Sequence, residues 1–555
     1  MPVVVGQDFL VNNFAFSAQQ SPSITALQNG GYAVSWHVTE VDGTAHIVAR
    51  EFSAAGVPDA DEGIVNSSLV PQTGQPTVAT LSSGRVVFAW SSETGGASGL
   101  DIRAQIFGAN GAVLGAEILI NSKTGYNQTA PDITALSNGR FVVTWHSFEF
   151  GGNEYDIRGR VFNANGVALG SDFVVNSTTI QDQYNPSVTA LAAGRFAVTW
   201  FANQGIGGDN NIRARIFNAD GTPLAHDFIV NSTTAGDQGN PSITTLSDGR
   251  LVATWNSDEG FTGNDIRARL FTASGTAIGP DFIVNSLRDD RQIDPGITSL
   301  ADGRFIVTWA SSILGEAGAD IKARIFNANG SAAGTEFFVN TTVADNQFSP
   351  EVTQLINGKI VVVWHSFDTA GSVSNIHSAI INPNIFQGTS VNDRWIGGNS
   401  NERMSGLDGR DTFYGMGGSD TLNGGGGNDT LIGGLGRDVL TGGLGADHFD
   451  FNAVAETAKT VTTCDTILDF VHLSDKVDLL DIDASTKSTG NAAFHFIGTA
   501  AFHKVAAELH YTKVNLAGTV NDKTFVSGDV NGDGVADFQI ALTGLITLTA
   551  TDFFL

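Results

Sequence analysis

The chain has 555 residues, more than one hydrophobic core supports, so two or more domains are expected. Its 57 acidic and 29 basic residues give a net charge of −28, which argues against binding to nucleic acid or to an anionic membrane surface. No apolar run reaches the roughly 18 residues that a membrane-spanning helix needs, so no membrane span is expected.

A single cysteine, Cys464, excludes an intrachain disulfide. A secreted protein without disulfides needs another means of stabilisation, and bound metal is the obvious candidate. The first residues, MPVVVGQDF, lack the basic and long apolar segments of a signal peptide. We therefore expect a chain that is either cytosolic or exported by an unconventional route.

The first two-thirds of the chain repeat with a period of 54 or 55 residues, marked by Trp36, Trp90, Trp145, Trp200, Trp255, Trp309 and Trp364. The fourth unit, NPSVTALAAGRFAVTW and then NIRARIFNADGTPLAHDFIVN, contains four short apolar segments separated by turn residues. Four strands per unit and seven units predict an all-β, seven-bladed β-propeller over residues 1–383. A solenoid of stacked sheets is the alternative, but it needs polar caps that the sequence does not show.

The seventh unit ends after its third apolar segment, and the missing fourth segment matches QDFLVN at residues 7–12. We expect this N-terminal segment to close the ring by pairing with the strand around Ile376–Ile380. A closed ring leaves no long exposed sheet edge.

Two features recur in nearly every unit and are therefore expected to hold the ring together. The tryptophans are expected to pack between neighbouring sheets. The basic residues of the Asp-Ile-Arg-Ala-Arg segment are expected to pair with recurrent acids, with a ligand-binding basic rim as the alternative; they are Arg103, Arg158, Arg160, Arg213, Arg215, Arg267, Arg269, Lys322 and Arg324.

Departures from the repeat indicate candidate functional residues. A histidine follows the tryptophan in three units only, and an acid lies four residues after the tryptophan in the same units. Ring closure makes the first and seventh blades neighbours and would bring together His37, Glu40, His365 and Asp368. Such a cluster could serve acid–base catalysis or bind a metal, although internal duplication alone can leave the same pattern.

Glycine-rich units of nine residues, of the form GGxGxDxUx, follow the ring. The acid at the sixth position recurs as Asp411, Asp420, Asp429, Asp438 and Asp447, and two degenerate units carry Asp393 and Glu402 in the same register. Two units make one turn of a parallel β-roll, so acids eighteen residues apart can share stacked Ca²⁺ ions. Turn carbonyls would add oxygen ligands at the glycines Gly409, Gly418, Gly427, Gly436 and Gly445. The alternative is a plain glycine-rich linker.

These units, over residues 388–450, resemble the repeats-in-toxin (RTX) family. The segments CDTILDFVHLSDKVDLLDIDA, FHFIGTAAFH and GDVNGDGVADFQIALTG, with the final TDFFL, resemble the C-terminal domain of serralysin-type secreted metalloproteases. The resemblance implies a β-roll and β-sandwich, with the serralysin-like part at 451–555. It also implies calcium-driven folding, an extracellular location, and a C-terminal signal read by type I secretion machinery with its ABC transporter. The His-Glu-x-x-His protease motif is absent, so the resemblance does not extend to proteolysis.

Two further calcium sites are expected downstream. Oxygen-bearing side chains at Asp529, Asn531, Asp533 and Asp537 have the spacing of an EF-hand loop without its last glutamate, and a plain Asx-rich turn is the alternative. Glu456 and Asp465 fall where the resembled family has another calcium pair.

Three functions remain open for the propeller. The first is a binding module for extracellular polysaccharide or a cell surface, because repeated weak sites give avidity. The alternatives are a polysaccharide lyase or hydrolase and a structural matrix or surface-layer component. Chelation is expected to unfold residues 388–555 and leave the propeller largely intact.

Overall fold

The computed structural model describes residues 2–4, 6–13, 17–67, 73–93, 99–124, 126–149, 154–178, 181–203, 209–258, 263–286, 288, 291–312, 318–341, 346–367, 374–487, 490–515 and 522–555. The chain divides into two compact units, Val4–Asn382 and Pro383–Leu555, the second of which also contains the first three residues. In the part of the chain that is described, no helix is long and apolar enough to cross a membrane.

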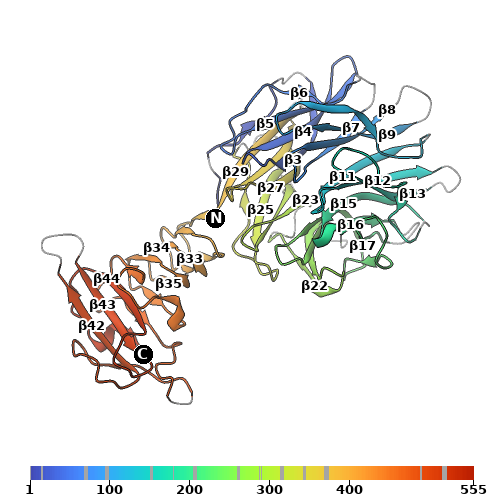
Figure 1. The fold of residues 1–555 in the computed structure, drawn as a ribbon. Coiled ribbons are helices and arrows are strands. Elements are labelled where there is room, and N and C mark those ends of the chain that lie inside the picture. The colour runs from blue at the N-terminus through green and yellow to red at the C-terminus, as the bar shows by residue number, and fades with distance from the viewer. Residues whose placement is uncertain are drawn as a thin grey trace. The chain divides into compact units, whose positions relative to one another are not determined.

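The first unit contains six separate four-stranded antiparallel sheets, here called blades one to six (Figure 1). Blade one comprises β3 (Ala18–Ala26), β4 (Tyr32–Thr39), β5 (Ala45–Phe52) and β6 (Gly63–Ile64), and blade two β7 (Thr73–Thr80), β8 (Val86–Glu93), β9 (Leu100–Phe107) and β10 (Val113–Leu119). Blade three comprises β11 (Gln128–Ala135), β12 (Phe141–Glu149), β13 (Glu154–Phe162) and β14 (Phe173–Val174). Blade four comprises β15 (Gln183–Ala190), β16 (Phe196–Ala202), β17 (Asn211–Phe217) and β18 (Phe228–Ile229), with the 3-10 turn η1 (Ala192–Gly194). Blade five comprises β19 (Asp237–Thr245), β20 (Leu251–Asp258), β21 (Asp265–Phe271) and β22 (Ala277–Ile283). Blade six comprises β23 (Arg291–Ser299), β24 (Phe305–Ser312), β25 (Asp320–Phe326) and β26 (Phe337–Phe338).

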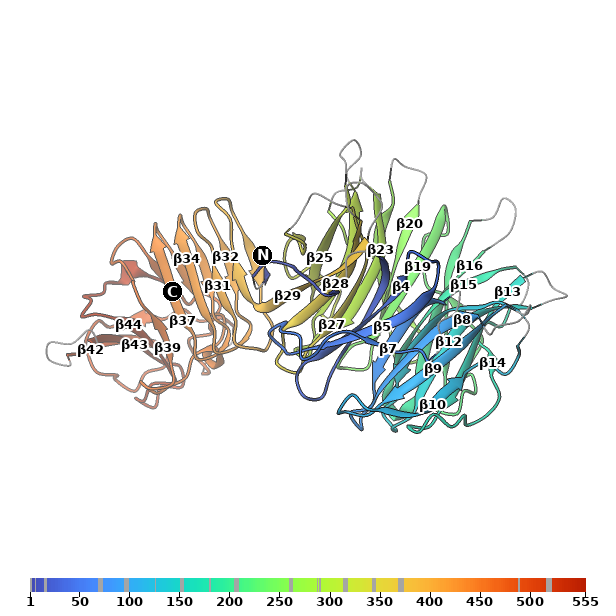
Figure 2. The same cartoon turned by 90° about the horizontal axis from the view of Figure 1, so that it is seen from above.

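The blades form a propeller-like array, which Figure 2 shows from a second direction. The first strands of successive blades contact one another in chain order, and β27 (Asn346–Gln354) contacts both β23 and β3. The seventh repeat supplies β27, β28 (Ile360–Phe367) and β29 (Ser374–Gln387), which belong to a longer sheet of 13 strands. The number of separate four-stranded blades is therefore six rather than the expected seven, because β29 continues past the repeat and pairs at Ile385–Gln387 with β31.

The N-terminal segment pairs where the sequence predicted. In β2 (Phe9–Leu10), Phe9 pairs with Ser378 and Leu10 with His377. The Asn12 side chain then accepts a hydrogen bond of 2.8 Å from the backbone N–H of Ile376. An asparagine makes the same bond in each of the six blades, at Asn66, Asn121, Asn176, Asn231, Asn285 and Asn340. The preceding β1 (Pro2–Val4), which the sequence did not indicate, also pairs with β29.

The packing role predicted for the seven repeat tryptophans is confirmed. All are fully buried, and each lies in a cluster with apolar residues of the neighbouring repeat. Six of the indoles donate a hydrogen bond of 2.5–2.8 Å to a glutamine seventeen residues earlier. The exception is Trp90, whose Nε1 has no partner among the described residues. The position seventeen residues before it, where the other repeats have glutamine, is Thr73.

The pairing with acids predicted for the repeated basic residues is confirmed for the first basic residue of each segment, whereas the second donates to backbone oxygens instead. Arg158 and Asp172, for example, form a buried ion pair at 2.9 Å. The second arginine of the segment joins successive repeats, as Arg160 does by donating to the backbone oxygens of Gly170 and Ile120. Arg50 donates in the same way to Val11, which places the N-terminal segment in the role of the preceding repeat.

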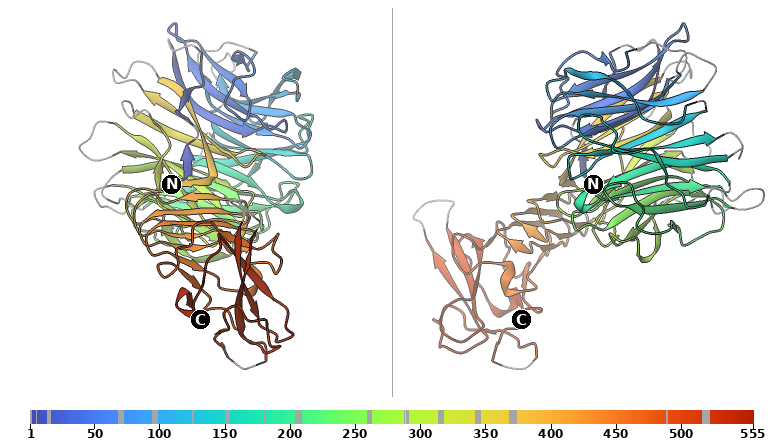
Figure 3. Two further views of the ribbon diagram at one scale, coloured as in Figure 1. Left: turned by 90° about the vertical axis from the view of Figure 1, so that its left-hand side faces the viewer. Right: turned by 45° about the vertical axis from the view of Figure 1, so that its right-hand side comes forward.

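The second unit begins as a parallel roll of two sheets, whose successive turns Figure 3 shows stacked in chain order. One sheet contains β30 (Arg394–Ile396), β32 (Thr412–Tyr414), β35 (Thr430–Ile432), β38 (His448–Asp450), β40 (Lys476–Asp478) and β45 (Phe553–Phe554). The other contains β31 (Arg403–Ser405), β34 (Thr421–Gly426), β37 (Val439–Leu444), β39 (Asp465–Ile467), β44 (Phe538–Thr543), β43 (Lys523–Asp529), β42 (Glu508–Val514) and β41 (His495–Phe496). A small pair, β33 (Gly417–Gly418) and β36 (Leu435–Gly436), and the turns η2 (Val454–Glu456) and η3 (Ala550–Asp552) complete the unit.

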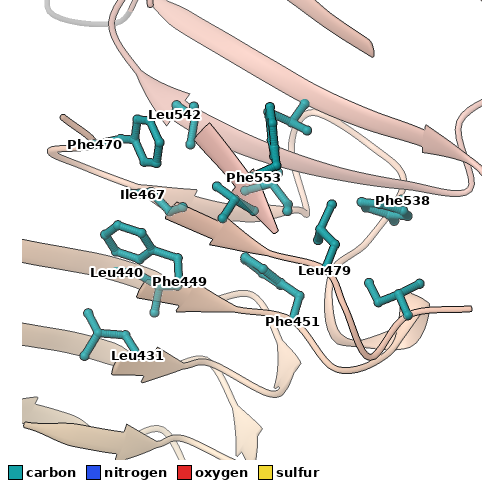
Figure 4. Close-up of a cluster of buried hydrophobic side chains, with 14 of the residues drawn as sticks. Leu431, Leu440, Phe449, Phe451, Ile467, Phe470, Leu479, Phe538, Leu542 and Phe553 are labelled. Carbon is teal, nitrogen blue, oxygen red and sulfur yellow. The ribbon is translucent and has the colours of Figure 1, made fainter. Parts of the chain in front are cut away.

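The roll repeats every eighteen residues, as the nine-residue units predict. Thr412 pairs with Thr430 and Thr430 with His448 in one sheet, while Thr421 pairs with Val439 in the other. The apolar residue of each unit points inward, and Phe413, Leu422, Leu431, Leu440 and Phe449 are all fully buried. Figure 4 shows Leu431, Leu440 and Phe449 continuing into one core with Ile467, Leu542 and Phe553.

Candidate calcium and ligand sites

The repeated acids of the roll form a continuous ladder of hydrogen bonds. The backbone N–H of Asp411 donates to Oδ1 of Asp429 at 2.7 Å, and Asp429 donates to Asp447 at 2.9 Å. Asp420 donates to Asp438 in the parallel series. The degenerate units join at the start, where Asp393 donates to Asp411 and Glu402 to Asp420. The structure thus stacks the acids in the pairs that the eighteen-residue period predicts.

In the five regular units the second carboxylate oxygen of the acid lacks such a partner. The Oδ2 atoms of Asp411, Asp420, Asp429, Asp438, Asp447 and Asp465 are buried and have no hydrogen-bond partner among the described residues. Burial raises the pKa of Asp411, Asp438 and Asp447 to about 6 and that of Asp420 to about 8, and neighbouring carboxylates add to the rise. A buried anion without a partner is costly, so these oxygens fit a site that a cation completes.

Glycines bring backbone oxygens to the same positions. A Cβ at Gly424 would collide with Oδ2 of Asp429 and with the backbone oxygen of Gly442, and Gly415 and Gly406 have the same surroundings one unit and two units earlier. The glycines predicted as ligands, Gly409, Gly418, Gly427, Gly436 and Gly445, have φ of 120–145°, and a Cβ on Gly427 or Gly445 would collide with the glycine carbonyl eighteen residues earlier. The first glycine of each unit therefore matters as much as those predicted.

The donor set is that of a hard cation. No group of three or more His, Cys, Asp or Glu side chains converges on one point within the described ranges, so backbone carbonyls would supply most ligands. Carboxylate and carbonyl oxygens in glycine-rich turns are the ligands that Ca²⁺ takes. The residues present therefore fit calcium.

Two acids continue the ladder beyond the regular repeat. Asp465 accepts from Asp438 at 2.7 Å and Asp475 accepts from Asp447 at 3.1 Å, over 27 and 28 residues. Burial raises the pKa of Asp465 to about 8, and the charges of Asp438 and Glu456 add to the rise. Glu456 accepts from Asn452 at 2.8 Å. Sequence reasoning found Asp465 by resemblance only and missed Asp475, because these stacking steps of 27 and 28 residues differ from the regular step of eighteen.

The loop with EF-hand spacing is internally hydrogen-bonded. Asp529 accepts from Gly532 and Gly534 at 2.6 and 2.8 Å, and Asn531 donates to Asp537 at 2.8 Å. Asp533 accepts from Val535 at 2.8 Å. These bonds are typical of an Asx-rich turn, and calcium binding by this loop stays a prediction.

A sequence model of the RTX calcium-binding nonapeptide repeat matches residues 396–431 and 424–453. Residues 396–453 are RTX calcium-binding repeats. Repeats of this family imply calcium binding and are typical of secreted proteins. The five regular acids, from Asp411 to Asp447, lie within the matched residues, and the ladder continues past them to Asp465 and Asp475.

Of the four catalytic candidates of the first unit, the three described residues, His37, Glu40 and His365, do not converge on one point. Trp36 packs with Val361 and Val363 of the seventh repeat, so the next residue of the strand, His37, points to the opposite sheet face. Glu40 instead lies 3.4 Å from Nε2 of His46 and accepts from Ser17 at 2.9 Å. Burial lowers the pKa of His37 and of His365 to about 4, so both are neutral at neutral pH. Asp368 lies outside the described residues.

A row of aromatic rings, here called the aromatic stripe, joins blades three and four. Its members, Tyr126, Phe148, Tyr155, Tyr184 and Phe201, follow one another at ring-centroid distances of 5.0–6.3 Å. His146 contacts two of the tyrosines edge-on. The Tyr126 side chain is 38% exposed, and Tyr155 of blade three and Tyr184 of blade four are half-buried. Sequence reasoning missed this surface because its members are up to 75 residues apart.

The first strands enclose a central channel of about 320 Å³. Each contributes a proline preceded by a residue with φ of 31–54°, at Ser21, Gln75, Ala130, Asn185, Asn240, Asp294 and Ser349. Three carboxylates, Asp132, Asp294 and Glu351, line the channel and interrupt its otherwise neutral polar wall. Burial raises the pKa of Asp132 to about 6. Glu351 is open to the channel but enclosed by the ring, which raises its pKa, and the Asp132 charge adds to the rise.

The solved structures found by comparison share little sequence with this chain. A protein of unknown function from Dyadobacter fermentans is 12% identical, with a TM-score of 0.42, over 69% of this chain and 98% of its own. The GH93 α-L-arabinofuranosidase of Fusarium graminearum is 12% identical, with a TM-score of 0.40, over 68% and 98%. The NanB sialidase of Streptococcus pneumoniae is 9% identical, with a TM-score of 0.38, over 69% and 70%. No curated protein matches the sequence. These values are too low for the activity of any of these proteins to be transferred to this chain.

Proposed function

We propose that this chain is an exported, calcium-stabilised RTX protein whose propeller-like unit binds polysaccharide along the aromatic stripe. The stripe carries the proposal: partly exposed rings in a continuous row suit stacking against successive sugar rings, and tyrosine hydroxyls add hydrogen bonds. Asp182 supplies a carboxylate beside it, since it accepts from the backbone N–H of Tyr155 at 2.9 Å.

We infer that the first unit is a seven-bladed propeller in which β27, β28, the first part of β29 and β2 act as the seventh blade. The contact of β27 with β3 supports this inference. So does Asp8, which exchanges hydrogen bonds with Thr341 of the preceding repeat, as Asp172 accepts from Ser122. A ring closed by both ends of the repeat region would hold the aromatic stripe rigidly.

The second unit is proposed to act in export and stability. Asp411, Asp420, Asp429, Asp438 and Asp447, with glycine carbonyls of the turns, would hold the Ca²⁺ ions, whose charge would neutralise the buried carboxylates. A serralysin-like secretion signal is proposed for the final residues, to be read by a type I ABC transporter. Folding would then follow export, because calcium is abundant only outside the cell.

The proposal is tested with the calcium-loaded full chain on a panel of extracellular polysaccharides, by affinity electrophoresis. Tyr155→Ala and Tyr184→Ala should each weaken binding at least about tenfold, since each removes a stacked ring worth about 1.4 kcal/mol or more. Phe338→Ala is the matched control, because Phe338 is 51% exposed on blade six and outside the stripe. Equal binding by the wild type and all three variants, or no binding by the wild type, would refute the polysaccharide proposal.

A second candidate, a polysaccharide lyase or hydrolase, is favoured by the carboxylates of the channel. Asp132 and Glu351 differ from the residues that other repeats place there, and a raised pKa suits a general acid. Release of soluble sugar, lost in Glu351→Gln and kept in Tyr155→Ala, would support this candidate in place of the binding module.

A further inference from the structure

Blade one lacks a basic residue that the five following blades share. Opposite the tryptophan, the third strands of blades two to six place Arg103, Arg158, Arg213, Arg267 and Lys322. Each lies 2.5–3.5 Å from the acid of its own fourth-strand segment. In blade one the partner of Trp36 is Val48, whereas the acid remains, as Glu62.

Glu62 keeps the rest of the arrangement. Its Oε2 accepts a hydrogen bond of 3.1 Å from the backbone N–H of Asn13, as Asp172 accepts from Ser122 at 2.9 Å and Asp227 from Ser177 at 2.7 Å. The acid is therefore positioned as in the other blades, but the arginine that normally pairs with it is replaced by valine.

A cavity of about 490 Å³ lies at this position. Its wall includes two carboxylates, Glu62 and Glu40, and the apolar side chains of Val38, Val48 and Ile64, and none of its described lining residues is a lysine or arginine. His46 also lines it and is only 8% exposed. Its Nε2 faces Glu40 at 3.4 Å, while its buried Nδ1 has no hydrogen-bond partner within the described part of the chain.

We propose that this cavity binds a small organic cation, an alkylguanidinium or alkylammonium group, in the place of the missing arginine. The alkyl part would contact Val38, Val48 and Ile64, and the charged group would pair with Glu62 and Glu40. A metal ion fits less well, because no three acidic or imidazole groups converge in the residues described.

The test uses the calcium-loaded full chain, with methylguanidinium and n-butylammonium chlorides as probes and neutral methylurea as the isosteric control. The methyl NMR signal of Ile64 should shift saturably with one site and a millimolar Kd for at least one cation, as befits so small a ligand. The tighter of the two identifies the preferred charged group. No saturable shift with either cation, or equal binding of methylurea, would overturn the proposal.

Variants separate this site from nonspecific effects. Val48→Arg should abolish binding by supplying the arginine of the repeat, and it should raise Tm if that arginine pairs with Glu62. Glu62→Gln should weaken binding at least tenfold without filling the cavity. Glu51→Gln, on the same strand but outside the cavity, should bind as the wild type does. Unchanged binding in Val48→Arg and Glu62→Gln would refute the assignment, whether or not the aromatic stripe binds polysaccharide.

Discussion

Replacement of Asp438 by asparagine should have opposite effects on the C-terminal unit with and without calcium. Asp438 is fully buried, and its Oδ1 accepts from the backbone N–H of Asp420 at 2.7 Å. Asparagine keeps this acceptor and removes the charge. It also replaces Oδ2, the oxygen that has no partner in the described structure, with an NH₂ group.

The size of the calcium-free effect follows from the pKa. Burial raises the pKa of Asp438 from 3.8 to about 6, so the folded state binds its proton more tightly than the unfolded state does. Ionisation therefore destabilises the calcium-free fold, and at about pH 8 the full cost of a two-unit shift, about 3 kcal/mol, is present. Asp438→Asn should recover up to that amount in chelator. In calcium it should lose a charged ligand and weaken calcium affinity at least about tenfold, or about 1.4 kcal/mol.

Hydrogen exchange read by mass spectrometry measures both effects in the full chain. Peptides from 403–450 should exchange more slowly in Asp438→Asn than in the wild type in chelator, and should need more calcium for full protection. Asp408→Asn, an exposed acid of the same roll, is the matched control and should change neither. Faster exchange of the variant in chelator, or an unchanged calcium requirement, would refute the reasoning.

Three further predictions concern pH, the core and ring closure. In chelator, lowering the pH from about 8 to about 5 should raise the protection factors of 403–450, taken relative to the intrinsic exchange rate at each pH. Asp411, Asp438 and Asp447 have folded-state pKa values near 6, above their unfolded values, so their ionisation destabilises the fold as pH rises, and lower protection factors at pH 5 would contradict this. Thr73→Gln should raise the free energy of unfolding of the first unit by about 1 kcal/mol, because it gives the Trp90 indole the glutamine partner of the other repeats. Gln183→Thr removes that partner from Trp200 and should lower the free energy of unfolding by about 1–3 kcal/mol. Denaturant titrations measure both, and no change in either variant would show that the indole bond is unimportant. Asn12→Ala should cost about 1–3 kcal/mol by unpairing the buried N–H of Ile376, with faster exchange at 374–382 before other repeats, and uniform exchange across the repeats would argue against a closing role for the N-terminal segment.

Periodic features were predictable from the sequence. A period of 54 or 55 residues fixes which residues face a neighbouring repeat, so the burial of the tryptophans and the pairing of arginines with acids follow from the pattern. The nine-residue period likewise fixes the acid ladder, because a parallel roll places residue i beside residue i + 18. Even the pairing of the N-terminal segment with the strand around Ile376–Ile380 was predictable, since the seventh repeat lacks its fourth segment.

Features that join different repeats, or that break the period, were not predictable. Glu40 approaches His46 because a tight hairpin brings β4 and β5 together, whereas spacing from the tryptophan pointed to His37. The aromatic stripe depends on the contact between β12 and β15 of adjacent blades. Asp475 joins the ladder because the chain between it and Asp447 makes a longer turn, which no fixed spacing shows.

Both units must neutralise acids that the fold holds in fixed rows, and they do so with cations from different sources. In blades two to six the cation is a side chain of the chain itself, such as Arg158 beside Asp172, so this part of the fold needs no ligand. Among the described residues of the roll, no lysine or arginine forms an ion pair with Asp411, Asp420, Asp429, Asp438 or Asp447, and their buried Oδ2 atoms fit calcium from outside. Blade one lies between these cases, because Glu62 has the position of an arginine-paired acid, whereas Val48 takes the place of the arginine. An acid so placed, beside a cavity of about 490 Å³, is the point in the ring where an external cation most resembles what the fold elsewhere provides for itself.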